Sequence, residues 1–65
     1  MIKITKQQVQ GEIQSICTHA MDRLASDIDT ADRRGYHAYA TELSNVKLEI
    51  ERARNAAIER LEDMA

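Results

Sequence analysis

Apolar residues recur every three or four positions along the first half of the chain. Because an α-helix repeats every 3.6 residues, this spacing places the apolar side chains on one face of a single long helix. The stripe contains Val9, Ile13, Cys17, Ala20, Leu24, Ile28 and Ala31. Ile16 and Met21 flank it on opposite sides and widen the apolar face beyond what one partner helix would cover. The pattern predicts a helix over about residues 6–34.

Local signals specify both ends of this helix. Thr5 can act as the N-cap, with Gln8 three residues later completing a capping box. At the other end, Gly35 can adopt the left-handed conformation that closes a Schellman motif, in which Tyr36 approaches Ala31. The helix is therefore expected to begin just after Thr5 and to end just before Gly35.

Charged residues before the turn leave one alternative open. Arg33 and Arg34 complement the negative end of the helix dipole, and Asp29 can pair with Arg33 one turn away. Ser26 and Asp29 nevertheless form a second possible capping box, which would start a new, short helix. A break near Ser26 would give three helices instead of two.

A second apolar stripe follows almost immediately and also has helical spacing. It contains Tyr39, Leu43, Val46, Ile50, Ala53, Ala57, Leu61 and Met64. The pattern predicts a second helix over about residues 37–63. Its last turn carries Glu59, Glu62 and Asp63, whose negative charges oppose the helix dipole, so this end is expected to fray.

Two helices of similar length, joined by a turn at Gly35, are expected to fold back on each other as an antiparallel αα-hairpin. The chain is therefore predicted to be all-α, with residues 1–65 forming one hairpin domain. Because a bare hairpin leaves part of each stripe in water, we expect a homodimer that forms a four-helix bundle. The predicted dimer and core residues are Ile13, Ile16, Cys17, Ala20, Met21, Leu24, Ile28, Leu43, Val46, Ile50, Ala53, Ala57, Ile58 and Leu61. The pattern leaves open whether the hairpins pair parallel or antiparallel, and whether larger helical assemblies form.

Length and composition favour association over internal cross-links. A chain of 65 residues buries little apolar surface on its own, which leaves a small net stability. The single cysteine cannot close an intramolecular disulfide, and no Cys or His spacing fits a zinc site. No apolar stretch reaches the ~20 residues of a membrane span, and the chain starts without a signal-peptide pattern. We expect a soluble, cytoplasmic protein that does not bind membranes.

The sequence contains no arrangement typical of catalysis. His19 and His37 are expected to face solvent, and no serine, cysteine or carboxylate is spaced to form a dyad or triad with either. Cys17 lies on the apolar stripe without a nearby base. Asp27 and Asp29 only begin a calcium-loop pattern, which lacks the required glycine and the final glutamate. We predict a non-enzyme with no catalytic residue, metal, cofactor or small-molecule substrate.

Residues around the turn, together with one leucine, are the candidates for partner binding. Tyrosine and arginine are favoured at interfaces, because they bury a large area while keeping a polar group satisfied. The candidate partner-binding residues are Arg33, Arg34, Tyr36, His37, Tyr39 and Leu48. The alternative for the tyrosines is that they cap the end of the bundle core, and for Leu48 that it is an ordinary exposed leucine.

We expect a small protein-binding module that acts as an adaptor or as a stoichiometric inhibitor of another protein. Compact chains of this kind are common among bacteriophage and plasmid accessory genes. The alternative is a dimeric RNA- or DNA-binding regulator, because the expected architecture and chain length are similar to those of Rop, a plasmid copy-number regulator that binds paired RNA loops. A net charge of −2 and the mixing of basic with acidic residues do not favour nucleic acid.

Overall fold

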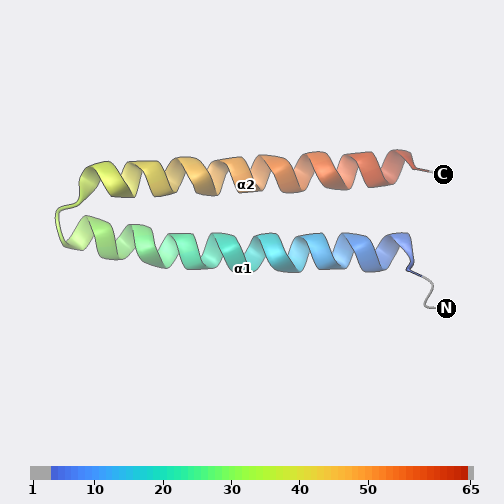
Figure 1. The fold of residues 1–65 in the computed structure, drawn as a ribbon, viewed down its shortest axis with the longest axis horizontal. Coiled ribbons are helices and arrows are strands. Elements are labelled where there is room, and N and C mark those ends of the chain that lie inside the picture. Colours follow the sequence, from blue (N-terminus) through green and yellow to red (C-terminus); the bar gives the residue numbers. More distant parts are fainter. Residues whose placement is uncertain (1–3, 65) are drawn as a thin grey trace.

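The computed structural model describes residues 4–64 and consists of two antiparallel helices joined by a short turn (Figure 1). Helix α1 spans Lys6–Arg33 and helix α2 spans His37–Asp63. The described residues contain no strand, so the predicted all-α hairpin is confirmed. The molecule measures 50 × 22 × 12 Å, with the two helices side by side along its longest axis. Residues 1–3 and 65 of the predicted domain lie outside the described residues.

The start of α1 is fixed by the predicted capping box. The backbone N–H of Gln8 donates to Thr5 Oγ1 over 3.1 Å, and the backbone N–H of Thr5 donates to Gln8 Oε1 over 2.8 Å. These bonds satisfy N–H groups that have no partner within the helix. The first helical residue is therefore the one that follows Thr5, as the sequence indicates.

The turn after α1 is the predicted Schellman motif. The N–H of Tyr36 donates to the carbonyl oxygen of Ala31 over 2.8 Å, and the N–H of Gly35 donates to that of Asp32 over 3.1 Å. Gly35 has a φ of +80°, a value that residues with a Cβ rarely adopt. Arg34 becomes the C-cap, so α1 ends one residue earlier than the predicted residue 34.

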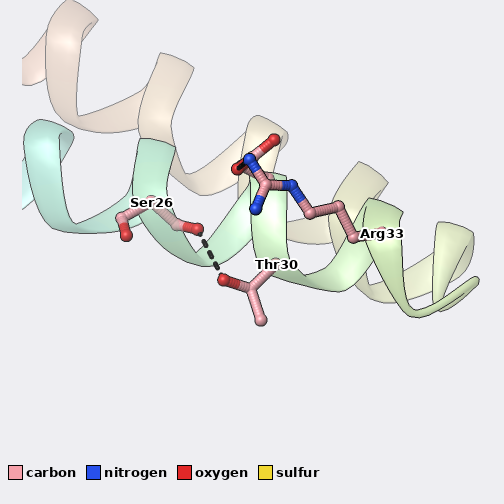
Figure 2. A network of polar contacts seen from close by, with 4 residues as sticks. Ser26, Thr30 and Arg33 are labelled. Atoms are coloured by element: carbon pink, nitrogen blue, oxygen red, sulfur yellow. Dashed lines mark hydrogen bonds and ion pairs between the residues drawn. The ribbon is translucent and has the colours of Figure 1, made fainter.

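Helix α1 continues without a break past Ser26, so the three-helix alternative is wrong. Thr30 Oγ1 donates to the carbonyl oxygen of Ser26 over 3.1 Å, one turn earlier in the same helix (Figure 2). Ser26 therefore lies inside a helix as an acceptor and does not act as an N-cap. The chain has neither proline nor glycine between Gly11 and Gly35 to interrupt the helix.

Burial is greatest next to the turn. Among residues 4–64, the only buried hydrophobic side chains are Ala31 in α1 and Ala40 in α2. Ile16 and Met64 lie at the edges of the stripes and are exposed. The half-buried apolar residues are Val9, Ile13, Cys17, Ala20, Met21, Leu24, Ile28, Leu43, Val46, Ile50, Ala57, Ile58 and Leu61. One hairpin thus covers each apolar stripe only in part.

Helix α2 packs against α1 with a slightly different set of residues from the predicted one. Tyr39 and Ala53 are exposed, although the sequence pattern places both on the stripe. Ala40 is buried and Arg54 is half-buried in their place. Beside the tight turn the helices approach closely, which favours a methyl group over a tyrosine ring between them. Arg54 is tolerated on the stripe because its aliphatic stem can cover apolar surface while its charged end reaches polar partners.

The end of the hairpin far from the turn is closed by a contact between the two helices. Lys6 Nζ donates to the carbonyl oxygens of Glu62 and Met64 over 3.2 Å and 3.0 Å. Its positive charge also offsets the negative end of the α2 dipole. Helix α2 therefore extends to Asp63, although the acids in its last turn favour fraying. Over the described residues, neither helix holds a stretch that is both apolar and long enough to cross a membrane.

Candidate functional site

Two tyrosines stand exposed at the turn between the helices. Tyr36 is the N-cap of α2 and Tyr39 lies in its first turn; they are 54% and 69% exposed. Their ring centroids are 6.0 Å apart and the rings are inclined by 55°, a geometry in which aromatic rings attract each other. The Schellman bond from Tyr36 to α1 fixes the backbone under this pair. The tyrosines do not cap the core of the single hairpin, since both rings remain largely in solvent.

Charged groups around the tyrosines form two local pairs. Arg33 Nη2 lies 2.8 Å from Asp29 Oδ2, one turn earlier in α1, as the sequence predicts. His37 Nδ1 lies 3.4 Å from Asp32 Oδ1 across the turn. Both pairs are exposed, so they contribute little to stability. The first pair balances the charge of Arg33, and the second places the Asp32 carboxylate beside the imidazole of His37.

Arg34 differs from these paired residues. It is exposed as the C-cap of α1, and within residues 4–64 its guanidinium forms no ion pair. The surface around the turn therefore carries two aromatic rings, one arginine without an ion pair, the Arg33–Asp29 ion pair and the His37–Asp32 contact. We call this surface the tip, and define it by the candidate residues Arg33, Arg34, Tyr36, His37 and Tyr39.

Leu48, the remaining candidate, does not belong to the tip. It lies about 18 Å further along α2 from Tyr36, at 1.5 Å of rise per residue. Its side chain is 44% exposed and lines a shallow groove of about 470 Å³ between the two helices. The groove is lined by Ala25, Ile28, Ser44, Lys47, Leu48 and Glu51. Leu48 is therefore part of the flank of the helix pair and not of an isolated outer face of α2.

A second, wider groove lies near the end opposite the tip, and the sequence pattern did not indicate it. Its volume is about 610 Å³, and all its lining residues belong to α1 or to the residue before its cap. The lining residues are Ile4, Gln8, Val9, Gly11, Glu12, Ile13 and Ser15. The one sequence signal for this groove is a glycine inside the predicted helix, Gly11. In the structure a Cβ at this position would meet nothing within 4 Å. The missing side chain widens this depression.

The histidines and the cysteine occupy separate places. His19 is exposed on α1, His37 is at the tip, and Cys17 is half-buried on the α1 stripe. Among the described residues, no three His, Cys, Asp or Glu side chains are grouped closely enough to hold a metal ion. The structure thus brings together the tip residues, and it does not bring them together with Leu48, His19 or Cys17.

Comparison with known proteins gives no family for this chain. No protein-family model, no curated protein and no solved structure matches it.

Proposed function

We propose that the protein is a non-enzymatic binding module that acts as a homodimer and uses its tip to bind another protein, as an adaptor or a stoichiometric inhibitor. One observation carries the proposal: the inclined pair of exposed tyrosines, Tyr36 and Tyr39, whose rings lie 6.0 Å apart on a fixed turn. Covering two aromatic rings that otherwise remain in solvent lowers the free energy of the complex, because apolar surface is removed from water.

The chemistry of the tip suits a protein partner. Tyrosine and arginine are enriched among interface residues that carry most of the binding energy, and Arg34 stands beside the tyrosine pair. Arg33 and His37 are already paired with Asp29 and Asp32. A surface that binds phosphate backbones needs unbalanced positive charge, whereas Asp29 and Asp32 balance the charges of Arg33 and Arg34 here.

Association of two hairpins is supported by the incomplete core. Within residues 4–64 only two alanines are buried among the hydrophobic residues, and the larger apolar side chains of both stripes are half-buried or exposed. A second hairpin would cover these side chains, which is the usual remedy for a chain too short to bury a core of its own. The dimer would also present two tips, so that one molecule could hold two partner sites.

The experiment is affinity capture followed by quantitative mass spectrometry. The wild-type chain is compared with the double variant Tyr36→Ala/Tyr39→Ala and with His19→Ala, a matched control at an exposed position of α1 away from the tip. We expect captured proteins that are retained by His19→Ala and lost with the double variant. If the same proteins are retained by all three chains, the tip is not the binding surface.

A further inference from the structure

The hairpin has two broad faces, and the groove beside Leu48 identifies one of them. Ala25, Ile28, Lys47 and Leu48 all line this groove, so they share one side of the helix pair. We call it the Leu48 face. Met21 belongs to it because it precedes Ala25 by one helical turn. Half-buried Arg54 follows Lys47 by two turns and lies on the same side.

The residues of the opposite face are identified from pairs of consecutive residues, one on each side of the contact between the helices. Val46 and Lys47 are both half-buried, and neighbouring side chains on a helix point about 100° apart. Since Lys47 is on the Leu48 face, Val46 is on the other. Ala20 and Met21 divide in the same way on α1. The residues on this second side, which we call the Ile16 face, are Val9, Ile16, Ala20, Val46, Ala53 and Ala57.

The two faces differ in charge. The Leu48 face has Lys47 and Arg54 half-buried along the contact between the helices. On the Ile16 face the half-buried residues along that contact are all apolar, and Ile16 itself is 61% exposed. Two exposed acids also lie on this side near the turn: Asp27, two turns after Ala20, and Glu42, one turn before Val46. Covering the Leu48 face would remove two half-buried cations from water at a large cost, whereas the half-buried side chains of the Ile16 face are apolar and its charged groups are exposed. A contact that completes the core is therefore favoured on the Ile16 face.

Both helices carry the same sequence pattern along this face. Residues 9–24 of α1 and residues 46–61 of α2 have the same amino acid at six aligned positions. The matching residues are Val9 and Val46, Glu12 and Glu49, Ile13 and Ile50, Ala20 and Ala57, Arg23 and Arg60, and Leu24 and Leu61. Because the helices are antiparallel, a rotation of 180° about an axis perpendicular to the Ile16 face exchanges α1 with α2. The matching residues then take each other's places, so the face is nearly unchanged. Such a face suits an isologous contact with its own copy, in which each surface meets itself.

A glutamate and an arginine border the Ile16 face on each helix. Glu12 lies one turn before Ile16, and Arg23 lies two turns after it. Glu49 and Arg60 flank the equivalent position of α2 with the same spacing. All four residues are exposed, and within residues 4–64 none of them forms an ion pair. Their charges are available to a molecule that covers the face.

These charges complement those of a second copy. Counted from the turn, Glu12 and Arg60 lie at nearly the same height, and so do Arg23 and Glu49. When the Ile16 faces of two copies meet with both turns at the same end, α1 lies over α2 of the second copy. Glu12 then meets Arg60 of that copy. When the copies face each other in opposite directions, α1 lies over α1 and Glu12 meets Arg23 of the second copy. In both arrangements Glu12 and Glu49 each meet an arginine, whereas in the first arrangement Glu42 would face Asp27 of the second copy, which favours the opposite-direction arrangement.

From this pattern we infer that the Ile16 face is the homodimer interface, and that its occupant is a second copy of this chain held in place by the four border charges. The inference rests on the homodimer of the proposed function and assigns its contact surface. The broad side of the hairpin spans 50 by 22 Å, which exceeds the roughly 800 Å² per partner that a standard interface buries. Ala20, Ala53 and Ala57 are small enough to let the helices of the two copies approach closely.

The first test compares a charge on each face. Ile16→Glu places a carboxylate on the Ile16 face, and Leu48→Glu places the same group on the other face at another exposed apolar residue. In sedimentation equilibrium at equal concentrations, we expect the wild type and Leu48→Glu to be dimers and Ile16→Glu to be a monomer. A wild type that remains monomeric at high concentration overturns the inference, and so does a dimer that only Leu48→Glu dissociates.

The second test exchanges the border charges and guards against a variant that simply fails to fold. Glu12→Arg/Glu49→Arg gives a border of four arginines, and Arg23→Glu/Arg60→Glu gives a border of four glutamates. Each double variant alone is expected to dimerise at least about tenfold more weakly than the wild type, because like charges meet across the interface. Mixing the two is expected to restore a heterodimer. If both double variants dimerise as tightly as the wild type, the border charges do not face each other and the inference is wrong.

Failure of this inference is distinguishable from failure of the proposed partner binding. Oligomeric state is measured on each purified chain, including the tip double variant, because Tyr39 lies two turns before Val46 on the same side of α2. Partner capture is measured separately, with a tip variant that still dimerises. If Ile16→Glu abolishes the dimer but the Tyr36→Ala/Tyr39→Ala variant still captures the partner, the Ile16 face is the dimer interface and the tip is not the partner-binding surface. If the tip variant loses partner capture but Ile16→Glu still dimerises, the tip is the partner-binding surface and the Ile16 face is not the dimer interface.

Discussion

Lys6 Nζ lies 3.0 Å from the carbonyl oxygen of Met64, so the first residue of α1 caps the end of α2. A lysine at this place supplies hydrogen bonds to carbonyl groups that a helix end leaves without partners. The contact joins segments that are 58 residues apart in the sequence. It therefore links the stability of the two helix ends far from the turn.

Replacing Lys6 by alanine is expected to loosen this end of the hairpin. The loss of two charge-assisted hydrogen bonds at an exposed site should lower the free energy of unfolding by about 0.5–1 kcal/mol. Amide hydrogen exchange at residues 61–63 should become faster while exchange near the turn is unchanged. Lys6→Arg is the control, because it keeps donors and charge. Equal exchange rates in all three chains would mean that the contact does not stabilise α2.

The two glycines should respond to alanine in opposite directions. Gly35 has a φ of +80°, so Gly35→Ala is expected to destabilise the hairpin by about 1 kcal/mol through backbone strain alone. Gly11 lies inside α1, where an added Cβ would meet nothing within 4 Å, so Gly11→Ala should stabilise the hairpin by about 0.5–1 kcal/mol. Urea unfolding at one fixed protein concentration measures both, since a dimer's stability depends on concentration. The same sign for both variants would contradict this account of the turn.

Ala40 is expected to tolerate little extra volume. It is buried beside the turn, so Ala40→Leu should cost about 1–3 kcal/mol by forcing the helices apart. Ala38→Leu is the matched control on the exposed side of the same turn of α2 and should change stability by less than about 0.5 kcal/mol. Thermal unfolding followed by circular dichroism compares the two. If both substitutions were equally mild, Ala40 would not lie against α1 in solution.

Nucleic acid binding is expected to be absent at physiological salt. Arg33 and His37 at the tip are paired with aspartates, and glutamates alternate with arginines along the Ile16 face. An electrophoretic mobility assay with RNA hairpins and duplex DNA at ~150 mM salt should therefore detect no complex. A complex that weakens steeply with salt and disappears in Arg33→Ala/Arg34→Ala would favour the nucleic-acid alternative over a protein partner.

The helix ends were predictable from sequence because each depends on a few adjacent residues. Thr5 and Gln8 form the reciprocal bonds of the capping box, and the N–H groups of Gly35 and Tyr36 donate to the carbonyl oxygens of Asp32 and Ala31. Short-range signals of this kind require no knowledge of how the helices pack. The false signal at Ser26 had the same form, but no proline or glycine stands between Gly11 and Gly35 to break the helix there.

The side of α2 that faces α1 was harder to predict. Hydrophobicity favours Ala53 over Arg54 and Tyr39 over Ala40, yet the structure buries the second member of each pair more deeply. The long stem of arginine and the small space beside a tight turn are properties of packing, which a pattern of apolar residues does not contain. The tip residues were found because tyrosine and arginine are favoured at interfaces, whereas the pairing of His37 with Asp32 across that turn required the three-dimensional structure.

The burial of Ala31 and Ala40 has a consequence for binding. These two alanines form the most closely packed layer among residues 4–64, and Ala31 also accepts the hydrogen bond that holds Tyr36 in the turn. The tyrosine pair thus stands on a preorganised base, so a partner that docks there meets backbone that is already ordered. If the proposed partner docks at the tip, little backbone entropy is lost on association, which favours tighter binding than the area alone would give.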